Sequence, residues 1–160
     1  MLVESQRPFY WISGILILSL LGIVIFSQYQ KIVDKNSIIV FTAAGPVKIQ
    51  VEYAKTSQEL ETGLMNRDSL EVNSGMFFIF PDEKSRSFWM KDTLIPLDMI
   101  FISSNGRVNE MTTQEPCPKT GTCHVYESKS PARYVLEING GQAEKWNMAS
   151  GDIVEIPTEM

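Results

Sequence analysis

Residues 63 to 98 read GLMNRDSLEVNSGMFFIFPDEKSRSFWMKDTLIPLD. Short apolar runs cover residues 76–80 and 87–90 of this stretch, and a third run begins at its end and covers 97–102. Pro, Asp, Ser and Gly residues separate these runs. Runs of this length between turn-forming residues are typical of β-strands. The stretch therefore predicts a sheet of short strands.

The same pattern continues on both sides of this stretch. Residues 38–42 and 47–53 predict a β-hairpin, because the second run alternates apolar and polar side chains along its length. Asn105 and Gly106 form a dipeptide that favours tight hairpin turns, and they predict a second hairpin after the 97–102 run. Further strands are predicted at residues 107–112, 134–138 and 153–156.

Only two short helices are predicted. Thr56 and Glu59 have the spacing of a capping box, which favours the start of a helix over residues 57–65. A second short helix is predicted over residues 142–146. Seven or so strands with two small helices predict a mainly β (α+β) fold, in the form of a small antiparallel β-barrel or sandwich.

Residues 9–26 form an apolar segment without charged residues. As a helix this segment spans about 27 Å, close to the hydrocarbon thickness of a bilayer, and so predicts one N-terminal transmembrane helix. The alternatives are a cleaved signal peptide, although no small-residue cleavage pattern follows Phe26, and a soluble hydrophobic helix. The expected domains are a short N-terminal segment over 1–8, the transmembrane helix over 9–26, a tether over 27–37 and a globular domain over 38–160.

Length and composition limit the classes of function. The chain has 160 residues, of which 44% are hydrophobic, and this is enough for one modest domain with its own core. The formal net charge is −5, and the Lys and Arg residues do not form a basic cluster. Because nucleic-acid phosphates require a basic surface, we expect no nucleic-acid partner.

The chain has two cysteines, Cys117 and Cys123, in one short loop that contains Pro and Gly. Two thiols so close together and no others predict a disulfide in an oxidising compartment, which favours an extracytoplasmic domain. Unpaired thiols are one alternative. A metal or redox site that uses both cysteines and His124 is another, although five residues separate the cysteines where such sites usually have two.

Charged residues within the apolar framework are candidate binding residues: Arg67, Lys91, Asp98 and Glu137. A buried charge requires a partner, so one interpretation is a structural ion pair of Asp98 with Arg67 or Lys91. The other interpretation is a polar ligand site at one end of the barrel, with Trp89 as a stacking wall. Glu137 lies on another predicted strand, and the same two interpretations apply to it.

Four methionines occur in or near the predicted strands: Met65, Met76, Met90 and Met99. Thioethers are soft ligands that favour Cu(I), so these residues raise the alternative of a copper site. Their positions within apolar runs are more typical of core packing. We therefore predict no metal ion and no cofactor.

Several blocks of sequence resemble one known family. They are Gly-Leu-Met-Asn-Arg (63–67), Gly-Met-Phe-Phe-Ile-Phe (75–80), Phe-Trp-Met-Lys-Asp-Thr (88–93), Pro-Leu-Asp (96–98), Val-Leu-Glu (135–137) and Gly-Asp (151–152). Together they resemble the family called domain of unknown function 192, over roughly residues 46 to 156. The resemblance implies that Arg67, Gly75, Met76, Trp89, Met90, Lys91, Pro96, Asp98, Glu137 and Gly151 match motif positions. The chain departs from the family pattern at residues 139–141, and the resemblance implies no particular reaction.

Two hypotheses for function follow. The first is a membrane-anchored extracytoplasmic module that binds a ligand or a protein of the cell envelope, without catalysis. The alternative is a small hydrolase or lyase, in which Asp98 or Glu137 acts as general base and Arg67 or Lys91 stabilises an anion. In both hypotheses the N-terminal helix places the chain in the membrane as a single-pass protein.

Overall fold

The computed structural model describes residues 17, 19–24 and 36–156. The chain divides into two compact units, residues 1–35 and 36–160, and each is described by itself.

In the first unit, residue 17 and residues 19–24 are helical. The predicted transmembrane helix over 9–26 lies mostly outside the described residues, as do the segment 1–8 and most of the tether over 27–37. Within the parts of the chain that the structure describes, no helix is both long and apolar enough to cross a membrane.

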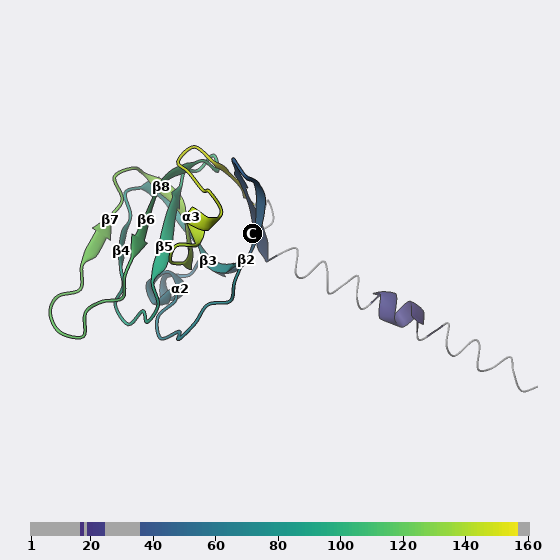
Figure 1. Cartoon of the computed structure of the whole chain (residues 1–160), viewed down its shortest axis with the longest axis horizontal. Helices are drawn as coiled ribbons and strands as arrows, with labels where there is room; N and C mark the ends of the chain where they lie inside the picture. Colours follow the sequence, from purple (N-terminus) through teal and green to yellow (C-terminus); the bar gives the residue numbers. More distant parts are fainter. Residues whose placement is uncertain (1–16, 18, 25–35, 157–160) are drawn as a thin grey trace, which may run out of the picture. The chain divides into compact units, whose positions relative to one another are not determined.

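The second unit is a mainly β domain with a large and a small sheet (Figure 1). The large sheet contains β1 (Ser37–Thr42), β2 (Gly45–Ala54), β3 (Ser74–Lys84), β5 (Leu97–Ile102), β6 (Val108–Gln114), β8 (Ala132–Asn139) and β9 (Ile153–Glu155). Its strand order is β6-β5-β8-β3-β2-β1-β9. The small sheet pairs β4 (Ser87–Trp89) with β7 (Val125–Glu127).

The large sheet curls until its two edges meet at one end. Arg107, just before β6, forms an antiparallel bridge with Ile153 of β9. The Val108 amide donates to the Asp152 carbonyl at 2.9 Å, and the Val154 amide donates to the Gly106 carbonyl at 2.7 Å. The fold is therefore a curled half-barrel, in agreement with the mainly β prediction.

Two short helices accompany the sheets, α2 (Ser57–Thr62) and α3 (Gln142–Lys145). The predicted capping box is present at α2. The Glu59 amide donates to the Thr56 hydroxyl, and the Thr56 amide donates to the Glu59 carboxylate at 2.9 Å. The helix ends earlier than predicted, because Gly63 leaves helical geometry with φ 48° and ψ −132°.

The prediction of a fully antiparallel sheet was wrong at one place. β2 and β3 run parallel, with Gln50 opposite Ser74 and Ala54 opposite Phe78. A parallel pair requires a crossover connection, and residues 55–73, which include α2, supply it. Strand β7 was not predicted at all, because it has only three residues and its ends are exposed.

Each face of the large sheet has its own hydrophobic core. We call one the α3 face, where Ala143 and Met148 join sheet residues such as Phe77, Ile100 and Leu136. We call the other the α2 face. There Leu60, Leu64, Phe88 and Tyr126 pack with sheet residues such as Phe78, Phe101 and Val135. Since β5 and β8 are covered on both faces, their residues are buried at nearly every position.

Candidate functional site

A cavity of about 180 Å³ lies on the α2 face of the large sheet. Its walls come from α2 and the turn that follows, from β3, β4 and β8, and from Thr93. Four aromatic residues line it: Phe78, Phe80, Phe88 and Trp89. The two carboxyl side chains in its lining belong to Glu61 and Glu137. We call this space the Glu137 cavity.

The aromatic walls follow from the alternation of β3 and from its packing against β4. Phe78 and Phe80 are two residues apart, so they share a face of the strand. The Phe88 ring lies across both, with ring centroids 5.4 Å from Phe78 and 6.3 Å from Phe80, in edge-to-face geometry. Such pairs are favourable beyond the apolar area that they bury, so these walls are fixed in place.

Glu137 lies at the centre of the sheet, where β8 pairs with β3 on one side and β5 on the other. It is opposite Met76 of β3 and Met99 of β5. Its exposed fraction is 4%. Among the described residues, no hydrogen bond or ion pair holds its carboxyl group, and burial raises the pKa of Glu137 to about 8. At neutral pH this carboxyl is mostly protonated, so it can donate a hydrogen bond into the cavity.

Arg67 lies outside the Glu137 cavity. Its guanidinium binds the Glu52 carboxylate through two hydrogen bonds, the longer at 2.7 Å between Nη2 and Oε2. These bonds lower the pKa of Glu52. Both residues line a second, adjacent depression of about 460 Å³, which shares Gly63 with the Glu137 cavity.

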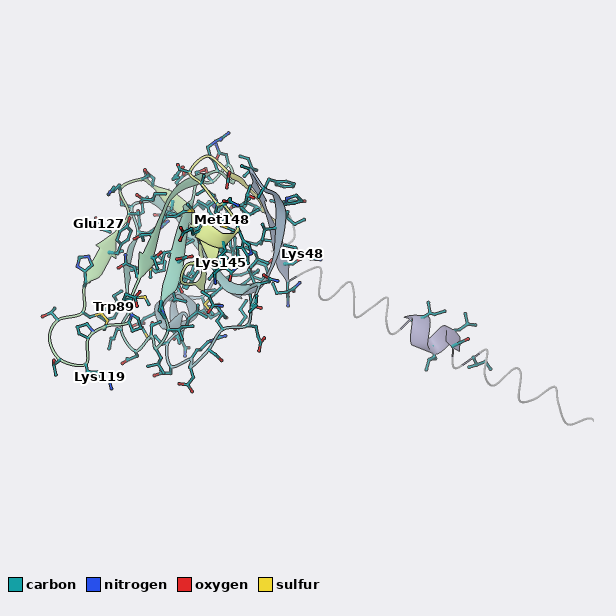
Figure 2. The ribbon with its side chains drawn as sticks, in the orientation of Figure 1. Lys48, Trp89, Lys119, Glu127, Lys145 and Met148 are labelled. Atoms are coloured by element: carbon teal, nitrogen blue, oxygen red, sulfur yellow. A yellow bond between two sulfur atoms is a disulfide. The ribbon has the colours of Figure 1, made fainter. Side chains whose placement is uncertain are left out.

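Lys91 and Trp89 lie together at the end of β4. The Lys91 ammonium is 5.2 Å from the centroid of the Trp89 ring. Trp89 is 44% exposed, so its ring lines the cavity and also contacts solvent. Figure 2 shows it on the β4 and β7 side of the domain, away from Lys145 and Met148 at α3.

Asp98 does not pair with Arg67 or Lys91, contrary to the ion pair considered from sequence. Its carboxylate accepts hydrogen bonds from the Thr113 hydroxyl at 2.7 Å, the Gly141 amide at 3.0 Å and the Ala143 amide at 2.8 Å. Two of these donors are at the start of α3. Asp98 therefore holds α3 against the sheet, and it lines a separate depression beside Met148.

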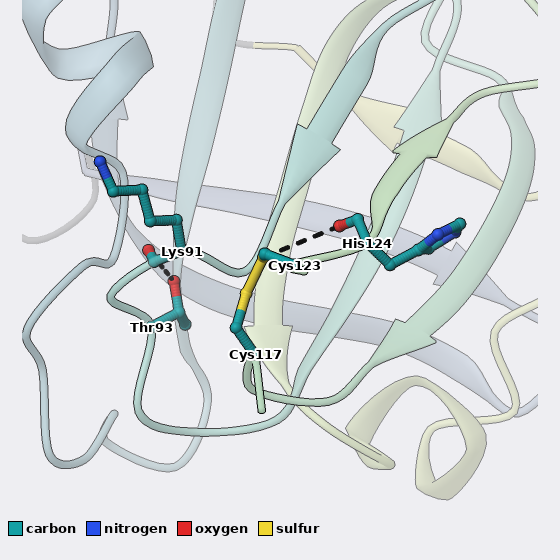
Figure 3. Close-up of a disulfide and its surroundings, with 5 residues drawn as sticks. All are labelled: Lys91, Thr93, Cys117, Cys123 and His124. Atoms are coloured by element: carbon teal, nitrogen blue, oxygen red, sulfur yellow. Dashed lines mark hydrogen bonds between the residues drawn. A yellow bond between two sulfur atoms is a disulfide. The ribbon is translucent and has the colours of Figure 1, made fainter. Parts of the chain in front are cut away.

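The predicted disulfide between Cys117 and Cys123 is present. Cys117 packs against the core of the α2 face, while the imidazole of His124 points away from the two sulfur atoms (Figure 3). Within residues 36–156 and the described part of the first unit, no three His, Cys, Asp or Glu residues group so as to hold a metal ion.

The sequence analysis overlooked Arg86, which is 6% exposed. Its side chain donates to the carbonyls of Asp82 and Ala132 and to the Asp82 carboxylate, and it lies 4.0 Å from the centroid of the Phe80 ring. Its backbone amide donates to the Ser128 hydroxyl at 2.9 Å. Arg86 thus fixes the strand that carries one aromatic wall of the cavity.

Other residues of the cavity were also missed, among them Gly63 and Glu61. A methyl group placed on Gly63 would lie 3.2 Å from the Phe78 ring and 3.9 Å from a Glu137 carboxyl oxygen. The sequence signal for this close packing was a Gly at the end of a short helix, because glycine allows the chain to turn tightly as it leaves the helix. Gly63 and Glu137 are far apart in the sequence, so local sequence patterns do not indicate that they lie close together in space.

Comparison with known proteins places this chain in a family. The family model for domain of unknown function 192, described as "Uncharacterized ACR", matches residues 39–156. The chain belongs to this family. A search of curated proteins gives no match.

Two crystal structures are similar to the domain. One, from Sinorhizobium meliloti 1021, is described as a candidate transcription regulator; it is 32% identical, with a TM-score of 0.67, over 74% of this chain and 91% of that chain. The other, from Novosphingobium aromaticivorans DSM 12444, is described as a protein of unknown function. It is 35% identical, with a TM-score of 0.68, over 75% of this chain and 84% of that chain.

Proposed function

We propose that this chain is a membrane-tethered, extracytoplasmic module that binds a small ligand in the Glu137 cavity. One observation carries the proposal: Glu137, a residue that is 4% exposed, lies in the wall of a cavity with aromatic walls, and its carboxyl group has no hydrogen-bond or ion-pair partner among the described residues. A buried polar group without a partner costs folding free energy. A ligand that forms a hydrogen bond or an ion pair with the Glu137 carboxyl group would offset this cost. An apolar cavity with one such polar group is the arrangement expected of a binding site.

The membrane tether rests on the uncharged apolar segment over residues 9–26. The extracytoplasmic location rests on the Cys117–Cys123 disulfide, because such bonds persist in oxidising compartments. Protease treatment of intact spheroplasts tests both. We expect the domain to be degraded while a cytoplasmic marker stays intact. Protection of the domain until the cells are lysed would contradict this topology.

Catalysis by Glu137 is the second candidate. A carboxyl whose pKa is about 8 has an affinity for protons that suits a general base near neutral pH. The geometry supports this candidate less well, because no Lys or Arg of the described residues lines the Glu137 cavity to stabilise an anion. Arg67 is bound to Glu52, and Asp98 already accepts three hydrogen bonds.

A fragment screen by ligand-observed NMR tests the binding function. The full-length chain in mild detergent is screened against neutral, cationic and anionic fragments of about six heavy atoms, since a cavity of about 150 Å³ admits benzene. We expect fragments that bind the wild type, compete with one another and fail to bind Glu137→Leu. Glu144→Gln, a change at an exposed residue of α3, should leave binding intact. Binding that is equal in all three proteins would overturn the proposal.

A further inference from the structure

The ionisable side chains in the lining of the Glu137 cavity are all acids. Among the described residues, Glu61 of α2 and Glu137 of β8 are its ionisable residues, and no Lys, Arg or His lines it. The strands that flank Glu137 present Met76 and Met99 opposite it, so they supply no countercharge. From the described part of the chain, the lining therefore receives a buried acid, an acid near the surface and no basic group.

The aromatic walls of the cavity, like its acids, favour a positively charged ligand. The faces of aromatic rings are electronegative and attract cations within about 6 Å of the ring centroid. Phe78, Phe80, Phe88 and Trp89 line the cavity together. The Trp89 ring already has a cation beside it, the Lys91 ammonium at 5.2 Å. A ring that accepts a protein ammonium is of the type that accepts a ligand ammonium.

We propose that the ligand of the Glu137 cavity is a small organic ammonium ion, held by the ionised Glu137 carboxylate and by the aromatic walls. This inference rests on the proposed function, and it adds the chemical class of the ligand. The cavity volume of about 180 Å³ limits the ligand to the size of choline or n-butylammonium, since about 150 Å³ holds benzene.

Binding of such a cation requires that Glu137 lose its proton. Because burial raises the pKa of Glu137 to about 8, the free site is mostly protonated at pH 7. The proton passes to the buffer when the ammonium ion enters, so about 0.9 proton is released for each ion bound at pH 7. A neutral ligand of the same shape releases none. Proton release therefore distinguishes binding of an ammonium ion by the Glu137 carboxylate from binding of a neutral ligand by shape alone.

Isothermal titration calorimetry of the full-length chain in mild detergent tests the inference. The probes are choline, n-butylammonium and 3,3-dimethylbutan-1-ol, which has the shape of choline without its charge. Each titration is run at pH 7 in two buffers that differ in ionisation enthalpy. The variants are Glu137→Gln, which keeps the shape of the side chain, and Glu144→Gln as a matched control at an exposed acid of α3.

We expect at least one of the two cations to bind about tenfold or more tightly than the neutral alcohol, with an enthalpy that depends on the buffer. Glu137→Gln should lose this preference and the proton release, while Glu144→Gln should leave both unchanged. Equal binding of the alcohol and the cations would overturn the ammonium ligand but leave the binding cavity in place. Absence of binding by both cations would overturn this inference, and the fragment screen then decides the proposed function separately.

Discussion

Asp98 and Glu137 lie on adjacent strands, one position out of register, so their carboxyl groups face opposite sides of the same sheet. Asp98 is opposite Ile138, and Glu137 is opposite Met99. Both carboxyl groups are buried, yet Asp98 accepts three hydrogen bonds and Glu137 accepts none from the described residues. The first carboxyl therefore holds α3 in place, and the second is available to a ligand.

As the pH rises from 5 to 8, the free energy of unfolding should decrease more in the wild type than in Glu137→Gln. Burial raises the pKa of Glu137 from 4.5 to about 8, so in this window the folded chain keeps a proton that the unfolded chain has lost. Unfolding then releases a proton, and a rise in pH favours it. The free energy of unfolding should drop by roughly 3 to 4 kcal/mol more in the wild type than in the variant.

Urea unfolding at one-unit steps of pH measures this difference. The comparison with Glu137→Gln removes the contribution of other acids, such as Glu52 and Asp82, whose pKa values are lowered and whose effect has the opposite sign. Parallel curves for the two proteins over the whole range would contradict a raised pKa at Glu137.

Asp98→Asn should destabilise the domain strongly. An amide in place of the carboxylate retains one acceptor oxygen, and its NH₂ group would face the amide of Gly141 or Ala143, which are donors themselves. A buried donor without a partner costs about 1 to 3 kcal/mol, and more where a charged acceptor is lost, so we expect a loss of roughly 2 to 4 kcal/mol. Urea denaturation of this variant, with Glu144→Gln as the matched control on α3, measures the loss. Equal midpoints for the two variants would show that Asp98 does not hold α3.

Local sequence patterns sufficed to predict most strands of this fold. Alternation and turn residues predicted the β1–β2 hairpin and the β5–β6 hairpin, and the capping box predicted the start of α2. These features depend on residues a few positions apart. The parallel pairing of β2 with β3 depends on the path of the crossover through α2, which local patterns do not contain.

The candidate site was predictable only in part, for the same reason. The apolar surroundings of Asp98 and Glu137 marked them as unusual, and Trp89 and Glu137 line one cavity. The partners of the charged residues were not predictable. Arg67 binds Glu52, which is 15 positions away across the β2–α2 connection, and the donors to Asp98 come from residues 113, 141 and 143. Sequence alternation indicates the face that a side chain occupies, but packing selects its partner.

Arg86→Ala should cost much more stability than Arg67→Ala. Arg86 is 6% exposed, stacks on Phe80 and donates to the Ala132 carbonyl, which would be left buried without its partner. We expect a loss of roughly 3 kcal/mol for Arg86→Ala. The Arg67–Glu52 pair has side chains that are 33% and 58% exposed, so Arg67→Ala should cost less than about 1 kcal/mol. Chemical denaturation of both variants gives the comparison, and a larger loss at Arg67 would contradict it.

Removal of the disulfide should cost a moderate part of the stability. Cys117 and Cys123 are six positions apart, and the chain-entropy relation gives about 2.4 kcal/mol for so short a loop. The double variant Cys117→Ser, Cys123→Ser should therefore stay folded, with a lower urea midpoint. Intact mass spectrometry of the native protein should show the two residues two hydrogens lighter than free thiols. A fully reduced pair in protein isolated from cells would remove the main support for an extracytoplasmic location.

Gly63→Ala should impair ligand binding more than its effect on stability explains, and Gly45→Ala provides the control. Both glycines have positive φ, 48° at Gly63 and 121° at Gly45, so both variants should lose about 1 kcal/mol or more through backbone strain. Only at Gly63 does the added methyl group enter the space between Phe78 and Glu137, whereas nothing lies within 4 Å of it at Gly45. We therefore expect titrations with a ligand of the cavity to show an affinity loss for Gly63→Ala alone. Equal affinities for the two variants would show that the ligand binds elsewhere. A ligand in the Glu137 cavity would contact the methyl group added to the cavity wall, and its affinity would fall.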